Sequence, residues 1–138
     1  MPKTSVSDCS VIELPLDRYD NGNRIAIENG KTIPFDVRRI YYLYDVPAGE
    51  SRGGHAHKQL DQLIVAASGS FNVVLFDGLE KRNVTLDRPS HGLLIGPGIW
   101  RDLEDFTAGS VCLVLASREY DENDYIRDYQ QYLAWRDQ

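Results

Sequence analysis

The chain has 138 residues, of which 42% are hydrophobic and 26% charged, the composition of one globular domain with one hydrophobic core rather than of a disordered chain. The formal net charge of −6 argues against a nucleic-acid or anionic-membrane partner, because such partners require a basic surface. No apolar stretch approaches the roughly 20 residues that span a bilayer, and the N-terminus lacks a signal-peptide core, which predicts a cytoplasmic protein.

Strand signals dominate most of the chain. Turn residues recur about every eight to twelve positions, the spacing of an all-β sandwich or barrel. The dipeptide Asn29-Gly30 is the one most typical of a two-residue hairpin turn, so it predicts a hairpin at that point. Cys9 and Cys112 lie far apart in the sequence and are expected to be reduced thiols. The expected strands cover residues 11–14, 24–28, 37–44, 62–67, 71–76, 83–86, 91–95 and 110–116.

The C-terminal part of the chain changes from the strand period to the helix period. After Asp121, apolar and aromatic side chains recur at i, i+1, i+4, i+7 and i+8, which is one face of a helix. Asp121 is a suitable N-cap, with acidic residues in the first turn. We therefore expect a single domain, with a β-barrel over about 8–118 and a helix over about 121–135 whose tyrosines pack against the sheet. The recurring residues are Tyr125, Ile126, Tyr129, Tyr132 and Leu133.

Residues 52–58 read RGGHAHK and contain two of the three histidines. Because alternate side chains of a strand point to the same face, His55 and His57 can project together into the mouth of a barrel. A β-barrel with such a pair suggests a cupin, that is, an RmlC-like double-stranded β-helix (jelly roll), here with a C-terminal α-helix. The third histidine, His91, stands alone at a turn-to-strand boundary and is expected to be structural.

A metal-binding cupin would add a Glu a few residues after the histidines and a further His from a later strand. In this chain the first position reads Asp61-Gln62 and the second reads Trp100-Arg101. A guanidinium stays protonated and offers no lone pair to a metal, so we expect no metal. Two alternatives remain open at this point: a facial triad of both histidines with Asp61, and histidines that are only structural.

Acid/base chemistry on an anionic substrate suits these residues better. Histidine takes up and releases protons near neutral pH, so two imidazoles on one face can serve adjacent atoms of one small substrate. Nearby cations favour a phosphate group, and Trp100 with Tyr41, Tyr42 and Tyr44 offers flat walls for a sugar or base ring. The alternatives are ordinary surface positions for the cations and a core or rim position for Trp100. The cations are Arg39, Arg52, Lys58 and Arg101.

Four blocks of the sequence, residues 33–42, 52–58, 92–100 and 114–127, resemble the sugar-nucleotide 3,4-ketoisomerases, which act on dTDP-linked 4-keto-6-deoxyglucose. The similarity runs from about residue 25 to about residue 132, nearly the whole chain. The resemblance implies a cupin jelly roll and a homodimer that exchanges N-terminal strands. It also implies a metal-independent reaction without a cofactor, on a dTDP-linked keto-deoxysugar.

Carried onto this sequence, the resemblance implies that His55 and His57 are the acid/base pair of an enediolate mechanism. Which of them moves the carbon-bound proton stays open. The position after Trp100 varies between His and Arg in these enzymes. Arg101 resembles the enzymes that make dTDP-3-keto-6-deoxy-D-glucose rather than its galacto epimer, in deoxy(amino)sugar biosynthesis. The expected substrate-binding residues are Arg39, Tyr41, Arg52, Lys58, Trp100 and Arg101.

Three other functions stay open. A sugar-nucleotide 3,5-epimerase shares the fold but needs a His–Asp base and a tyrosine acid at other positions. A non-catalytic cupin would bind a sugar nucleotide without exchanging its C3 proton in heavy water. A metal-dependent dioxygenase would retain a metal on purification, which metal analysis detects.

Overall fold

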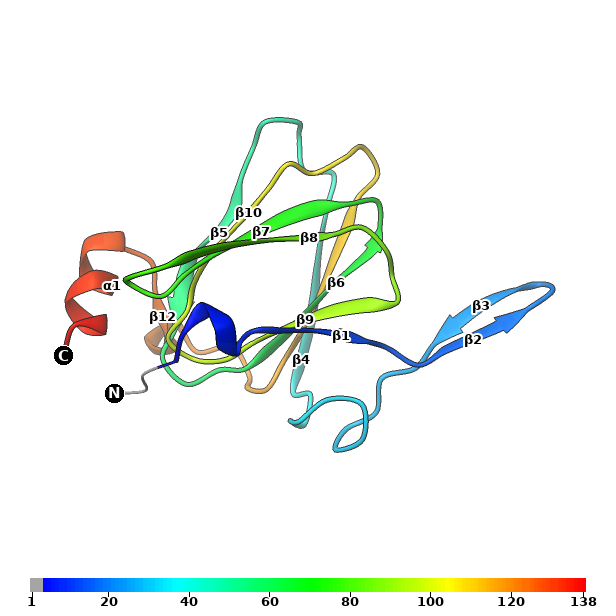
Figure 1. Ribbon diagram of the computed structural model, residues 1–138, viewed down its shortest axis with the longest axis horizontal. Coiled ribbons are helices and arrows are strands. Elements are labelled where there is room, and N and C mark those ends of the chain that lie inside the picture. Colours follow the sequence, from blue (N-terminus) through cyan, green and yellow to red (C-terminus); the bar gives the residue numbers. More distant parts are fainter. Residues whose placement is uncertain (1–3) are drawn as a thin grey trace.

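Two five-stranded antiparallel sheets face each other in the computed structural model, which describes residues 4–138 (Figure 1). The first sheet consists, in spatial order, of β1 (Ser10–Glu13), β9 (His91–Ile95), β6 (Gln62–Ser68), β11 (Val111–Ala116) and β4 (Arg39–Tyr44). The second consists of β12 (Tyr125–Ile126), β5 (Arg52–His57), β10 (Trp100–Glu104), β7 (Phe71–Phe76) and β8 (Lys81–Leu86). The predicted all-β fold is confirmed.

The main core lies between the two sheets and follows the alternation of their strands. In β7, Phe71, Val73 and Leu75 are almost completely buried, while the residues between them are half-buried. β6 is central in its sheet and is apolar on both faces, because Ile64 joins the main core and Leu63 joins a second cluster on the outer face. The segment between residues 25 and 37 covers that outer face. Its side chains there are Ile25, Ile27, Ile33, Phe35 and Val37.

Three short helices complete the described chain: η1 (Val6–Asp8), η2 (Glu122–Asp124) and α1 (Tyr129–Arg136). α1 covers the outer face of the second sheet, where the buried Tyr132 donates its hydroxyl to the carbonyl of Gly98 at 2.7 Å. Asp128 caps α1, because its Oδ1 accepts the backbone N–H of Gln131 at 2.9 Å. No helix within residues 4–138 is long and apolar enough to cross a membrane.

The C-terminal helix begins at Tyr129, eight residues later than predicted. Asp121 is an N-cap, as expected, but of the single turn η2, where its Oδ1 accepts the N–H of Asn123 at 3.0 Å. The chain then becomes extended, and Tyr125 pairs with His57 of β5 as strand β12. The prediction was wrong here because the spacing of tyrosines along one segment carries no information about backbone pairing with a strand far away in the sequence.

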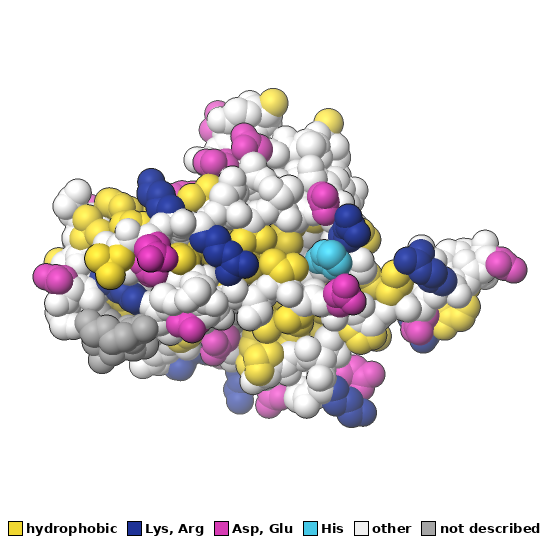
Figure 2. Space-filling view, in the orientation of Figure 1, with side chains coloured by type: hydrophobic (Ala, Val, Ile, Leu, Met, Phe, Trp, Pro, Cys, Tyr) yellow, Lys and Arg dark blue, Asp and Glu magenta, His cyan; other side chains and the backbone are white. Residues whose placement is uncertain are grey.

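The N-terminal hairpin turns at a different place from the one predicted. It consists of β2 (Leu16–Tyr19) and β3 (Gly22–Ile25), so it turns at Asp20-Asn21. Asn29-Gly30 instead forms a local turn, in which the N–H of Thr32 donates to the carbonyl of Glu28 at 3.1 Å. The expected strand 24–28 therefore ends at Ile25. Figures 1 and 2 show that the hairpin stands away from the body of the molecule.

Two glycines at similar backbone angles test how tightly the loops pack. Gly69 has φ +70° and Gly109 has φ +76°, so alanine is strained by the backbone at both positions. A Cβ on Gly69 would also lie 2.4 Å from Ser110 Oγ and 2.9 Å from Ser110 Cα, whereas a Cβ on Gly109 would meet nothing within 4 Å.

We predict that Gly69→Ala lowers the free energy of unfolding by about 2–4 kcal/mol, because overpacking adds to backbone strain. Gly109→Ala, the matched control, should lose only about 1–2 kcal/mol from strain alone. Urea unfolding followed by circular dichroism measures both. Equal losses for the two variants would contradict the packing argument.

Candidate active site

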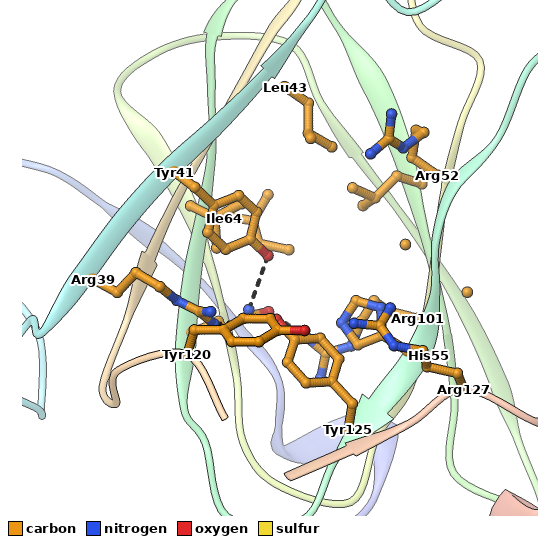
Figure 3. Close-up of a pocket in the computed structure, with 15 residues that line it drawn as sticks. Arg39, Tyr41, Leu43, Arg52, His55, Ile64, Arg101, Tyr120, Tyr125 and Arg127 are labelled. Atoms are coloured by element: carbon orange, nitrogen blue, oxygen red, sulfur yellow. Dashed lines mark hydrogen bonds between the residues drawn. The ribbon is translucent and has the colours of Figure 1, made fainter. Parts of the chain in front are cut away.

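A cavity of about 540 Å³ opens between the two sheets (Figure 3). Strands of both sheets and the segment that leads into β12 form its walls. Four arginines line the cavity, whereas none of the described lining residues is an Asp or a Glu. Since the whole chain carries a net charge of −6, this local excess of positive charge favours an anionic ligand. The arginines are Arg39, Arg52, Arg101 and Arg127.

Strand β5 reaches the cavity through a glycine bulge. Gly53, at φ +90°, and Gly54 add a residue to β5 opposite β10, where the register shifts between Arg101 and Leu103. A Cβ on Gly54 would lie 3.0 Å from Asp102 Oδ1, so a side chain there would require the Asp102 carboxylate to shift. Bulges re-aim side chains near active sites. Here regular pairing resumes at His55, directly opposite Arg101.

His55 and His57 lie on the same face of β5, as predicted. Their Nε2 atoms are 3.1 Å apart and their rings meet edge to face. His55 lines the cavity, and His57 is fully buried behind it. Burial, followed by the guanidinium of Arg101, lowers the pKa of His55 to about 3 and also lowers the pKa of His57. Both imidazoles are therefore neutral at pH 7 and can accept a proton.

Asp124 holds the far side of His57. Its Oδ2 lies 3.0 Å from His57 Nδ1, and its Oδ1 accepts the backbone N–H of Gln59 at 2.7 Å. Burial raises the pKa of Asp124, while the Gln59 N–H lowers it again. A carboxylate in this position makes His57 donate from Nδ1, so that His57 Nε2 presents a lone pair to His55. The chain Asp124–His57–His55 thus connects a buried acid to the cavity.

A second hydrogen-bonded chain, formed by three side chains, crosses the cavity. Arg101 is 1% exposed and donates to the carbonyl of Ile99 at 3.0 and 3.3 Å and to Gln62 Oε1. Gln62 Nε2 in turn donates to the Tyr41 hydroxyl at 3.2 Å, the contact dashed in Figure 3. None of the described carboxylates forms an ion pair with Arg101.

Aromatic rings and two further arginines form the wall nearest β12. Arg39 lies between the rings of Tyr41 and Tyr120, at 5.3 and 5.4 Å, and donates to the Tyr125 hydroxyl at 3.2 Å. Arg127 lies 4.2 Å from the centre of the Tyr125 ring. Cation–π contacts of this kind help to keep the arginines in place. Arg127 also donates to both carboxylate oxygens of Glu122, at 2.7 and 3.0 Å. The wall therefore offers both cationic groups and flat ring faces to a ligand.

The structure brings five of the eight predicted site residues to the cavity surface, and His57 lies directly behind His55. The five are Arg39, Tyr41, Arg52, His55 and Arg101. Trp100 is not among the lining residues, because it precedes Arg101 on β10 and so faces the other side, where it packs against Tyr129 and Tyr132. Lys58 lies beyond the end of β5 with an exposed side chain.

Sequence reasoning did not select Gln62, Tyr120, Asp124, Tyr125 or Arg127 as site residues. Four of them lie within residues 120–127, where the sequence pattern predicts the start of the C-terminal helix. One feature of the sequence could have identified these four residues. They lie within residues 114–127, one of the four blocks that carry the family resemblance. Its acidic residues were interpreted as helix-capping groups, although Asp124 is only 8% exposed.

The residues considered for a metal site do not converge. Within residues 4–138, no group of three or more His, Cys, Asp or Glu side chains is arranged to hold a metal ion. Asp61, the third member of the facial triad considered above, is not among the cavity-lining residues, and its N–H bonds to Ser117 Oγ at 2.9 Å. His91 lies on β9 opposite Glu13, outside the cavity.

Comparisons with known proteins agree with the predicted resemblance. The family model described as "FdtA: WxcM-like, C-terminal" matches residues 7–137. The chain is 47% identical over 111 residues to the TDP-4-oxo-6-deoxy-alpha-D-glucose-3,4-oxoisomerase of Aneurinibacillus thermoaerophilus, with 80% of each chain covered. The crystal structure of a 3,4-ketoisomerase from Helicobacter canadensis matches with a TM-score of 0.93 and 42% identity, covering 95% of this chain and 98% of that one. QdtA, a sugar 3,4-ketoisomerase from Thermoanaerobacterium thermosaccharolyticum in complex with TDP, matches with a TM-score of 0.93 and 39% identity, over 96% and 97% of the two chains.

We predict that Asp124→Asn reverses the tautomer of His57. The Gln59 N–H should retain the amide oxygen, so the amide NH₂ would face His57 Nδ1 and force its proton onto Nε2. ¹⁵N NMR of the imidazole nitrogens distinguishes the two tautomers. Asp121→Asn, which alters only the cap of η2, is the control. An unchanged Nδ1 resonance in Asp124→Asn would show that Asp124 does not set the tautomer.

Proposed function

The chain belongs to the FdtA (WxcM-like, C-terminal) family, and from this premise we propose that it converts a TDP-linked 4-keto-6-deoxyglucose into its 3-keto isomer by histidine acid/base catalysis. The relatives at 39–47% identity are named as 3,4-oxoisomerase or 3,4-ketoisomerases, so the chain is an isomerase of this class. The observation that carries the proposed mechanism is the neutral His55–His57 pair, 3.1 Å apart, in a cavity lined by four arginines.

The arginines suit the two anionic parts of this reaction. Arg39 and Arg52 remain accessible to solvent, and their forked guanidinium groups match the oxygens of a diphosphate. Arg127 is also exposed, but Glu122 already accepts from its Nε and Nη2 at 2.7 and 3.0 Å. Arg101 is buried beside the histidines, where an enediolate would develop negative charge. The rings of Tyr120 and Tyr125 offer faces on which a sugar or a base can stack.

The proposed reaction needs no oxidant and no cofactor. A histidine removes the C3 proton, which the neighbouring C4 carbonyl acidifies, and the electron pair of the C3–H bond enters the enediolate. A proton is then delivered to C4, the O3 proton is lost and O4 gains one, so the carbonyl has moved from C4 to C3. Each proton removed from carbon or oxygen is matched by one returned, which two imidazoles can manage at neutral pH.

The geometry favours different roles for the two histidines. His55 lines the cavity, so we assign the carbon-bound proton to it. His57 is fully buried, and its two ring nitrogens face His55 and Asp124. We therefore assign His57 to orienting His55 and to carrying protons to and from it. Arg101, rather than a histidine, stands after Trp100, and on the family resemblance this favours the gluco-configured product.

We predict that His55→Asn and His57→Asn each lower turnover by about 10²-fold or more, because each removes a proton-transfer group. His91→Asn, which changes the histidine outside the cavity, should retain wild-type turnover. Incubation of TDP-4-keto-6-deoxyglucose in heavy water, followed by NMR, reports exchange at C3, the position of the carbonyl and the configuration at C4. Tight TDP binding without C3 exchange would instead identify a sugar-nucleotide-binding protein. Normal turnover in both cavity variants would exclude the proposed mechanism.

We further propose that the protein is a homodimer that exchanges N-terminal strands. β4 is an edge strand, and its outward side chains Ile40, Tyr42 and Tyr44 are 60–63% exposed. Large exposed apolar side chains on a sheet edge favour pairing with another chain. The projecting hairpin β2–β3 adds Tyr19, which is 52% exposed. Figure 2 shows hydrophobic atoms on this arm, which a second copy would cover.

We predict that sedimentation equilibrium gives twice the mass of the chain at micromolar concentration. The double variant Tyr42→Asp/Tyr44→Asp should sediment as a monomer, because it places two charges in the proposed interface. Leu79→Asp is the matched control, since Leu79 is 92% exposed in the turn between β7 and β8. A monomeric wild-type protein, or equal dissociation by Leu79→Asp, would contradict this interface.

A further inference from the structure

Gln62 is a cavity residue to which the acid/base mechanism above gives no role. It opens β6, is 1% exposed and is bonded on both sides: its Oε1 accepts from Arg101 and its Nε2 donates to the Tyr41 hydroxyl (Figure 3). Gln62 and Arg101 stand in the sequence where a metal-binding cupin would carry its Glu and its last His. Here these two side chains bond to each other instead.

The positive charge of Arg101 has no counter-ion among residues 4–138. The ion pairs among residues 4–138 involve other groups, and the donors of Arg101 go to the Ile99 carbonyl and to Gln62. A buried cation without a counter-ion is costly to a fold, so a second partner is expected to arrive with the ligand. The enediolate of the proposed reaction is such an anion, which is where this inference rests on the proposed function.

We propose that Gln62 is a positioning residue that keeps the charge of Arg101 available to the reacting sugar and turns the Tyr41 hydroxyl proton into the cavity. A neutral amide can hold the guanidinium in place without cancelling its charge. A fixed, uncompensated cation then does in this cavity what a resident metal ion does in metal-dependent cupins, which is to stabilise an oxyanion.

The orientation of the Gln62 amide follows from its partners. A guanidinium only donates hydrogen bonds, so the oxygen of the amide must face Arg101 and its NH₂ must face Tyr41. The Tyr41 oxygen therefore accepts from Gln62, and the Tyr41 O–H proton is free to donate toward the substrate. A glutamate at position 62 would reverse this arrangement, because it would draw the Tyr41 proton to itself and neutralise Arg101.

The charge of Arg101 also acts on His55. The other charged groups near His55 include the carboxylate of Glu122, which forms an ion pair with Arg127 at 2.7 Å. His57 shares β5 with it, Arg39 faces it from β4, and Tyr125 and Arg127 face it from β12 and the residue that follows. Asp124 lies behind His57. Burial and then Arg101 lower the pKa of His55. A carboxylate beside Arg101 would oppose that effect and should raise the pKa of His55.

Gln62→Glu tests the charge, and Gln62→Met tests the hydrogen bonds without adding charge. We expect Gln62→Glu to lower kcat about 10²-fold with little change in KM for TDP-4-keto-6-deoxyglucose. The acid limb of its kcat/KM profile should move up by about one pH unit or more. Gln62→Met should lower kcat but leave the acid limb in place. Gln130→Glu is the control, because it adds the same charge at an exposed position on α1, and it should behave as wild type.

A titration without substrate separates this inference from the proposed function. NMR of the His55 ring should show a higher pKa in Gln62→Glu than in wild type, whether or not the protein isomerises this sugar. An unmoved His55 titration, or an acid limb that moves equally in Gln62→Met, overturns the inference. If Gln62→Glu does not fold by circular dichroism, a double-mutant cycle of Gln62→Met with Tyr41→Phe decides, because additive losses in kcat would exclude action through Tyr41.

Discussion

The guanidinium of Arg101 is enclosed between the two sheets with carbonyl and amide oxygens as its acceptors, and much of the site is arranged around it. It fixes the amide of Gln62, which fixes the hydroxyl of Tyr41. Burial, followed by this guanidinium, depresses the pKa of both histidines, so that both are neutral at pH 7. A buried cation of this kind is destabilising in isolation. Its place opposite His55 on β10 leaves this charge at the cavity, where the proposed reaction would supply an anion.

The two imidazoles come from one strand, whereas the cations around them come from several. β5 supplies His55, His57 and Arg52, and the other arginines of the cavity come from β4, β10 and the residue that follows β12. A cation on another strand can therefore change in length and identity while β5 keeps both imidazoles in place. The position of Arg101 is an example, because the resemblance indicates that it alternates between His and Arg among related enzymes.

Most of the fold is predictable from the residue pattern of single strands. In β7 buried and half-buried side chains alternate, and β9 has a short apolar run. Both patterns can be recognised within the strand itself. The same reasoning placed His55 and His57 on one face. It failed where partners are distant in sequence: Asp124 meets His57 across 67 positions, and no local pattern reports that contact. The prediction for Trp100 failed for a local reason. Trp100 and Arg101 are adjacent in the sequence, but adjacent residues of a strand face opposite sides, so only Arg101 lines the cavity. Arg39, Arg52 and Arg101 were identifiable because a cluster of cations is unusual in an acidic chain.

The pairing of Tyr125 and Ile126 with β5 has a consequence for biosynthesis of the protein. The residues that line the cavity extend from Arg39 to Arg127 in the sequence. Most strand pairs, apart from the hairpins β2–β3 and β7–β8, join residues far apart in the sequence. A topology of such high contact order folds late and as a unit. On the ribosome, the histidines emerge long before Asp124, so a nascent chain cannot complete this cavity until residues 120–127 have been synthesised. Activity would thus report the completed fold, and a chain truncated before η2 would retain both histidines but lack Asp124, the partner of His57.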